Sequence, residues 1–213
     1  MREKILSVIN QKGGVGKTTT VINLAAGLTM KGKKILVIDL DPQGNATTGL
    51  GLSNTDKSNQ TIYSVLNGTN TISDVIQKTS FENLDLITSN VDLSGLEVET
   101  AGDSRRAFIL KEQIMLYLNN SEASYDYVLI DCPPSLSLLT IMALVSAKEL
   151  LVPLQTEFFA LEGITQLTKT IDRIKINLNP SLIIRGIILT MFDKRNKLTT
   201  QVDIEARNYF KEK

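Results

Sequence analysis

The chain has 213 residues, of which 42% are hydrophobic and 22% charged, so one large domain with a buried core is expected. Lys and Arg number 23, as do Asp and Glu, and this formal neutrality excludes strong attraction of nucleic acids or membranes by the net charge of one chain. Histidine is absent, which excludes Ser-His-Asp and Cys-His catalysis. The single cysteine, Cys132, excludes a disulfide or a cysteine-based metal site within one chain, so we expect a protein of the reducing cytoplasm.

Short apolar runs alternate with segments of helical periodicity along the chain. The predicted strands are 5–9, 35–38, 84–87, 127–130, 150–152 and 183–189, and the predicted helices are 21–28, 107–118, 138–145, 161–178 and 198–209. Several strands are apolar nearly throughout, which is typical of parallel strands covered on both faces. The pattern predicts an α/β fold with a doubly wound, mostly parallel sheet and helices on both faces, as a single domain over 1–213. Ligands of such sheets bind beyond the carboxyl ends of the strands.

A glycine-rich loop at 10–20 joins the first strand to the first helix. Its backbone N–H groups and the helix N-terminus are suited to phosphate oxygens, as in the P-loop of proteins that bind ATP or ADP. Lys17 is expected to reach the β- and γ-phosphates, and the hydroxyl of Thr18 to bind Mg²⁺. The residues predicted to bind the nucleotide here are Gly13, Gly14, Val15, Gly16, Lys17, Thr18 and Thr19.

A second lysine, Lys12, makes this loop the deviant form of the Walker A motif. The strict pattern expects glycine where Gln11 stands, five residues before Gly16. Because Lys17 already serves its own site, we expect Lys12 to project outward and to contact the nucleotide of a facing subunit, as an arginine finger does. The alternative is a solvated loop lysine.

Carboxylates follow two other predicted strands. Asp39 and Asp41 are two residues apart in an extended segment, so both are expected to face the phosphate pocket. One of the two is expected to hold a magnesium-bound water and the other to orient the attacking water, although either alone could cap the turn that follows. Asp131 closes another apolar strand, as a Walker B acid does. The predicted metal ligands are Thr18, Asp39 and Asp131.

The stretches 10–20, 39–45 and 131–139 together resemble ParA-type chromosome and plasmid partition ATPases, in particular the short Soj-like members. The stretches 154–163 and 189–193 add to this resemblance, which extends from about residue 5 to 210. It implies an ATP-dependent sandwich homodimer that binds double-stranded DNA without sequence preference and hydrolyses ATP when a ParB-like partner stimulates it. It also implies catalytic roles for Lys12, Lys17 and Asp41, and places Gly13 at the dimer seam.

The same resemblance implies a DNA contact at Arg195, with Lys194 and Lys197 beside it, and a nucleotide contact at Met191. Without the resemblance, the three basic residues would be read as a solvated loop. Family members usually have Gly and Asn where this chain has Ser137 and Met142, and they usually continue past residue 213 with a segment that lines the adenine pocket. We therefore expect a nucleoid-associated cytoplasmic ATPase whose adenine pocket lacks that segment.

Three other functions remain open. A MinD-like membrane-cycling ATPase needs a basic amphipathic helix at the C-terminus, whereas 199–213 has the period of a core helix and carries acidic residues, so no stable membrane association is expected. A shortened scaffold that binds ATP without hydrolysing it is disfavoured because Lys12 and Asp41 are both present. A metabolic P-loop ligase would need further basic residues near the pocket, and no such set is evident. An electron carrier of the nitrogenase-reductase type is excluded because it needs two cysteines per subunit.

Overall fold

Within the residues that the computed structural model describes, 4–53, 60–119 and 125–211, seven strands form one sheet in the order β3-β4-β2-β5-β1-β6-β7. The strands are β1 (Lys4–Val8), β2 (Ile35–Asp39), β3 (Ile76–Lys78), β4 (Leu84–Ile87), β5 (Tyr127–Asp131), β6 (Glu149–Gln155) and β7 (Ile183–Thr190). Every neighbouring pair is parallel except β3 and β4. The predicted strands and the predicted fold class are confirmed, whereas the edge strand β3 was not predicted.

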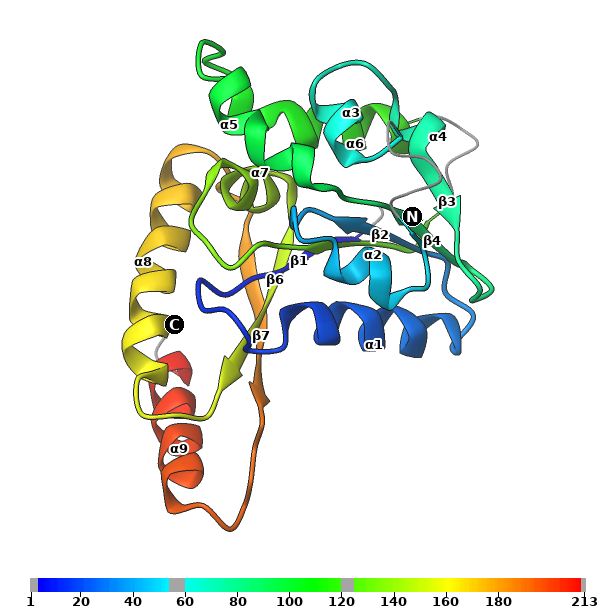
Figure 1. Ribbon diagram of the computed structural model, residues 1–213. Helices are drawn as coiled ribbons and strands as arrows, with labels where there is room; N and C mark the ends of the chain where they lie inside the picture. Colours follow the sequence, from blue (N-terminus) through cyan, green and yellow to red (C-terminus); the bar gives the residue numbers. More distant parts are fainter. Residues whose placement is uncertain (1–3, 54–59, 120–124, 212–213) are drawn as a thin grey trace.

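Helices cover both faces of the sheet (Figure 1). They are α1 (Lys17–Thr29), α2 (Asn45–Gly49), α3 (Ile62–Leu66), α4 (Ile72–Val75), α5 (Leu96–Glu99), α6 (Ile109–Leu118), α7 (Leu138–Ser146), α8 (Ala160–Asn177) and α9 (Lys197–Lys211), with 3-10 turns at Val91–Gly95 and Arg106–Phe108. The five longest helices match the predicted ones. The short helices α2 to α5 were not predicted. None of the described helices is long and apolar enough to cross a membrane.

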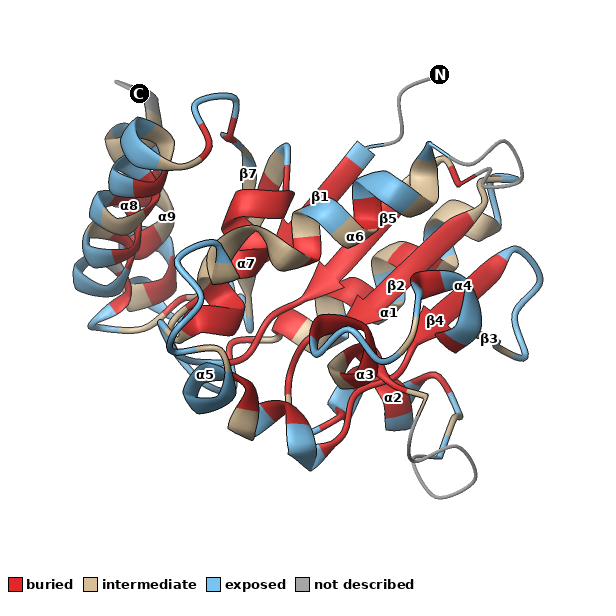
Figure 2. Cartoon of the chain, turned by 90° about the horizontal axis from the view of Figure 1, so that it is seen from above, coloured by how far each residue is buried: buried red, intermediate tan, exposed pale blue. Residues whose placement is uncertain are grey.

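Strand β2 shows why the central strands are apolar without alternation. All of its residues are buried, as Figure 2 shows for the middle of the sheet. Ile35 and Val37 pack against α1 on one face, whereas Leu36 and Ile38 face α6 and α7 on the other. Burial of each such side chain contributes about 1.5–3 kcal/mol, so both faces stabilise the strand. Met142 on α7 is fully buried in the cluster that contains Leu36 and Ile38.

The register of the central strands brings their carboxyl ends to one edge. Val8 at the end of β1 and Asp39 at the end of β2 both lie opposite Asp131 at the end of β5. The glycine-rich loop leaves β1 at this edge and runs into the N-terminus of α1. The fold therefore places the loop and the acidic strand ends side by side, as parallel α/β sheets do at their ligand sites.

Candidate functional site

The loop after β1 encloses a cavity of about 500 Å³. Gly14 and Gly16 have φ angles of +74° and +89°, which a residue with a side chain rarely adopts, so glycine is needed for the loop to turn into α1. The cavity is lined by Gly13, Gly14, Gly16, Lys17, Thr18, Thr19, Ile22, Asp41, Asn45, Pro134 and Met191. Most of the predicted nucleotide-binding residues are thus brought together, and buried Val15 lies outside this lining.

Lys17 is the basic residue of this lining. Its side chain is buried, and its ammonium donates a hydrogen bond of 2.9 Å to the carbonyl of Lys12 across the loop. Burial lowers the pKa of Lys17, while the charges of Asp131 and Asp41 act in the opposite direction. A buried ammonium with one neutral acceptor is well placed to exchange that acceptor for the oxygen of an anion.

Thr18 and Asp131 form the pair expected of a magnesium site. The hydroxyl of Thr18 donates to one oxygen of Asp131 at 2.7 Å, and the other oxygen of Asp131 is buried and has no hydrogen-bond partner in the part of the chain that is described. Burial raises the pKa of Asp131 to about 7, with smaller increases from the charges of Asp39 and Asp41 and opposition from Thr18 and Lys17. An unpaired buried carboxylate oxygen beside a hydroxyl fits a hard cation.

The described residues contain no group of three or more acidic, cysteine or histidine side chains that could hold a metal by itself. A magnesium ion at this place would therefore depend on phosphate oxygens and water for most of its ligands. This is how Mg²⁺ is usually bound beside nucleotides.

The two carboxylates that follow β2 have different surroundings. Asp41 lines the cavity, and its side chain accepts a hydrogen bond of 3.0 Å from the N–H of Gln43. Asp39 is fully buried and is not part of the cavity lining, and its two oxygens accept hydrogen bonds from Thr47 and from the N–H of Asp41. The structure thus shows Asp39 in contact with the protein, and its expected role toward the phosphate pocket and magnesium stays a prediction. The contact with Thr47 arises at the turn at Gly44 (φ +64°), after which α2 folds back and brings Thr47 onto the end of β2.

The side chain of Lys12 projects from the loop and forms an ion pair within its own chain. Its ammonium forms an ion pair with the carboxylate of Glu157, just after β6, and its side chain is half-exposed. Its backbone N–H donates to the side chain of Asn10 at 3.0 Å, and Asn10 in turn donates to the carbonyl of Pro153 at 2.7 Å. Neither Asn10 nor Glu157 was assigned a role from the sequence, although the position of Glu157 after a strand is the signal that identified the other acids.

The end of β7 borders the same loop. The hydroxyl of Thr190 donates to the carbonyl of Val15 at 2.9 Å, and exposed Met191, with a φ of +52°, lines the cavity. The basic residues Lys194, Arg195 and Lys197 follow and are not part of this cavity. They line a separate groove with the first turns of α9. The guanidinium of Arg195 is paired with Asp193 at 2.7 Å.

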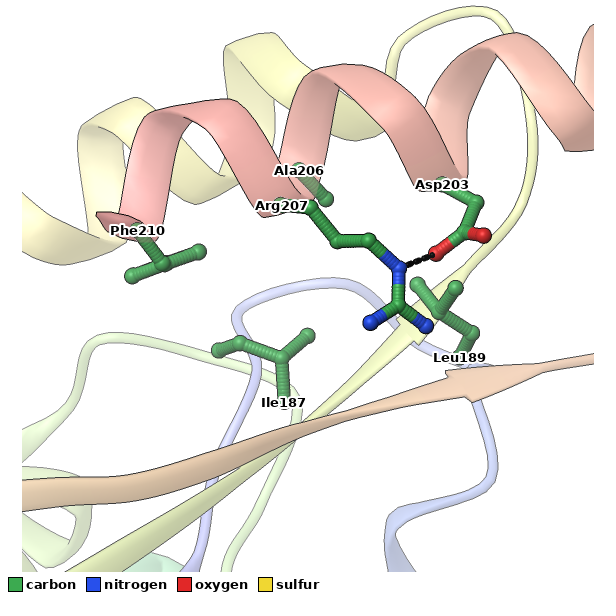
Figure 3. A pocket seen from close by; sticks show the side chains of 6 residues that line it. All are labelled: Ile187, Leu189, Asp203, Ala206, Arg207 and Phe210. Carbon is green, nitrogen blue, oxygen red and sulfur yellow. Dashed lines mark hydrogen bonds and ion pairs between the residues drawn. The ribbon is translucent and has the colours of Figure 1, made fainter. Parts of the chain in front are cut away.

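A further cavity of about 350 Å³ lies between β7 and α9 (Figure 3). Apolar side chains of the two elements line it, and the ion pair of Arg207 with Asp203 at 2.7 Å lies at its wall. None of the predicted site residues contributes to it. We assign the functional site to the loop cavity instead.

Residues 3–184 match a family model described as an AAA domain. The chain is 48% identical over 210 residues to the chromosome partitioning protein ParA of Caulobacter vibrioides, covering 99% of this chain and 78% of that protein. It is 45% identical over 210 residues to the sporulation initiation inhibitor protein Soj of Bacillus subtilis, covering 99% and 81%. A solved structure of cobyrinic acid a,c-diamide synthase from Mycobacterium smegmatis, with bound ADP and magnesium, matches with a TM-score of 0.89 at 37% identity, covering 97% of this chain and 82% of that one.

Proposed function

The chain belongs to the ParA/Soj family of chromosome-partitioning ATPases, and we propose that it is a DNA-partition switch driven by ATP hydrolysis. In this proposal ATP and Mg²⁺ close a homodimer, the dimer binds double-stranded DNA without sequence preference, and a ParB-like partner stimulates hydrolysis and release. The observation that carries the proposal is the glycine loop with Lys17 and Thr18 in the lining of its cavity, and Asp131 behind them as the acceptor of the Thr18 hydroxyl.

Each of these residues has a distinct task in phosphoryl transfer, which depends mainly on positioning and charge stabilisation. The glycine N–H groups and Lys17 bind the phosphates, and Thr18 and Asp131 hold the site of the metal. Magnesium, when bound, neutralises charge on the β- and γ-phosphates. Asp41 lies in the cavity wall, where its carboxylate can orient the attacking water.

Lys12 is assigned to the partner's nucleotide. Its side chain does not line the cavity of its own chain, and its ammonium is held at the surface by Glu157. On dimerisation its ammonium would lie beside the γ-phosphate of the nucleotide bound to the facing subunit. In comparable enzymes a positive side chain at this place accelerates hydrolysis about 10³–10⁵-fold.

DNA binding is assigned to Lys194, Arg195 and Lys197. Their loop is exposed, and a homodimer doubles the number of basic residues that a single neutral chain offers. Contacts with phosphates alone fit binding without sequence preference. They also make the affinity depend steeply on salt.

The similarity to cobyrinic acid a,c-diamide synthase raises a second possibility, a metabolic ligase. Such an enzyme must hold an anionic substrate beside the nucleotide. Among the described residues that line the loop cavity, Lys17 is the one basic side chain, and it is already assigned to the phosphates. The relatives named for partition are also more similar in sequence, at 45–48% identity.

Size-exclusion chromatography of the Asp41→Ala variant tests the switch, because this variant should bind ATP without consuming it. We expect elution as a dimer with ATP and Mg²⁺ and as a monomer with ADP. A monomer under both conditions would contradict the proposal. Release of phosphate by the wild type, but not by Asp41→Ala, in the presence of DNA and the ParB-like partner separates a hydrolysing switch from a scaffold.

A further inference from the structure

A buried hydrogen-bond network joins the end of β2 to α2, and we propose that Thr47 and Asp39 are positioning residues that hold Asp41 in the wall of the cavity. The proposal rests on the function proposed above, since it concerns the carboxylate assigned to the attacking water. It replaces the role of metal ligand that Asp39 was expected to have.

The network is centred on Thr47, whose side chain is fully buried. Its backbone N–H and its hydroxyl both donate to the same oxygen of Asp39, each at 2.7 Å. The hydroxyl also accepts a hydrogen bond of 3.1 Å from the N–H of Ser89, just beyond β4. One hydroxyl thus joins the ends of two neighbouring strands to α2.

The second oxygen of Asp39 connects this network to Asp41. It accepts the backbone N–H of Asp41 at 3.2 Å. The backbone of Asp41 is therefore attached to the same carboxylate that holds Thr47. All three hydrogen bonds to Asp39 are charge-assisted and buried, which makes them stronger than neutral ones.

The segment between the two attachment points forms one side of the cavity. Asp41 lies near its start and Asn45 near its end, and both line the cavity. The turn between them contains Gly44 in a left-handed conformation and is closed by the Gly44 N–H, which donates to the carbonyl of Asp41 at 2.9 Å, so the turn would move as a unit with its attachments to Asp39. A displacement of a catalytic group by about 1 Å can lower a rate about 100-fold, so the network would control turnover more than binding.

The alternative role for Asp39, as a ligand of magnesium, fits the surroundings less well. Both of its oxygens are occupied by hydrogen bonds from the chain, whereas one oxygen of Asp131 is buried without a partner in the described residues. The carboxylate of Asp39 therefore stabilises the protein through its contacts with Thr47 and Asp41, which leaves it less suited to bind a ligand.

Steady-state ATP hydrolysis by Thr47→Val tests the proposal, because valine keeps the shape of threonine and removes the hydroxyl. We expect kcat to fall about tenfold or more while KM for ATP stays within about twofold. Thr47→Ser should recover most of the loss. The matched control is Thr48→Val, which changes an exposed threonine of the same helix and should leave kcat and KM unchanged.

A double-mutant comparison separates positioning from a general loss of structure. In single-turnover reactions of Asp41→Asn, addition of Thr47→Val should cause little further loss, because the residue through which Thr47 acts is already impaired. Losses that multiply would overturn the proposal. If Thr47→Val does not fold, Asp39→Asn serves instead, with the same expected fall in kcat and unchanged binding of ADP.

Hydrogen exchange of the Asp41 amide, followed by NMR, distinguishes failure of this proposal from failure of the ATPase function. The amide should exchange slowly in the wild type and in Thr48→Val, and faster in Thr47→Val. Equal rates in all three would overturn the positioning role even if the protein hydrolyses ATP. If the protein shows the expected exchange pattern but has no ATPase activity, the structural role of Thr47 stands and the proposed ATPase function is contradicted.

Discussion

Lys12 and Glu157 are paired within one chain, although 145 residues separate them in sequence. The pair joins the loop that encloses the nucleotide cavity to the segment that follows β6. Both side chains keep part of their surface exposed, at 49% and 29%. In the proposed dimer Lys12 serves the facing subunit, so the ion pair would hold it within its own chain before dimerisation and would have to open for the dimer to form.

The first prediction concerns this restraint. Glu157→Gln should strengthen dimerisation with ATP and Mg²⁺ by up to about thirtyfold, because two exposed ion pairs open for each dimer and each contributes at most about 1 kcal/mol. Sedimentation equilibrium in the Asp41→Ala background measures the effect without hydrolysis. Glu162→Gln, an exposed acid on the first turn of α8, is the control. An unchanged or weaker dimer would show that Glu157 does not restrain Lys12.

The second prediction concerns magnesium. Thr18→Ala should lower the affinity for ATP at least about tenfold when Mg²⁺ is present, because the hydroxyl beside Asp131 is removed. In EDTA the same change should have little effect, since the glycine loop and Lys17 remain. Isothermal titration with and without Mg²⁺ measures both affinities. A loss of equal size in EDTA would assign Thr18 to folding of the loop and not to the metal.

The third prediction concerns pH. Burial raises the pKa of Asp131 to about 7, above the usual carboxyl value near 4. Between these values the folded protein holds a proton that the unfolded chain has released, so this group makes the free energy of unfolding fall as pH rises. Below about pH 4 both states are protonated, and the contribution to the slope disappears.

Asp131→Asn removes this contribution. The free energy of unfolding of the variant minus that of the wild type should therefore increase as pH rises from about 4 to about 7. Urea denaturation in EDTA at several pH values measures the difference, and without nucleotide or metal the comparison concerns the protein alone. A difference that does not change with pH would contradict the raised pKa.

The fourth prediction concerns Arg195, whose guanidinium is paired with Asp193. Asp193→Asn should strengthen binding to double-stranded DNA in the ATP state, because it releases the guanidinium. Arg195→Ala should weaken binding and reduce the salt dependence by about 0.9 for each DNA phosphate that it leaves without a positive partner. Arg207→Ala on α9, another exposed arginine paired with an acid, is the control. Identical salt slopes in all variants would place the DNA-binding surface elsewhere.

The sequence predicts the main elements because their periodicity is long and regular. Five helices and six strands follow from apolar runs and helical stripes. The edge strand β3 covers only Ile76–Lys78 and has one apolar residue, and α2 to α5 have four or five residues each, so neither shows a period. In β3 and in α2 to α5 the sequence is too short to show a helical or strand periodicity, and tertiary packing determines the secondary structure of these segments.

The functional site also contains residues that the sequence predicts and residues whose contacts depend on tertiary packing. The glycine loop with Lys17 and Thr18 is evident from the sequence because it joins an apolar strand to a helix, and Asp131 is evident because it closes an apolar strand. The different contacts of Asp39 and Asp41 have a physical cause: side chains two residues apart share a face only inside a strand, and β2 ends at Asp39. The contacts of Thr47 and Glu157 depend on segments distant in sequence, and no local pattern indicates them.

The central claim is that Lys12 acts on the nucleotide of the facing subunit, and mixing two inactive variants tests it most directly. Lys12→Ala and Asp41→Ala should each hydrolyse ATP at background rates. In an equal mixture, half of the dimers are mixed and each has one complete site, so we expect recovery to about a quarter of the wild-type rate with double-stranded DNA present. A mixture that stays at the rates of the separate variants would show that Lys12 serves its own chain, and would contradict the account.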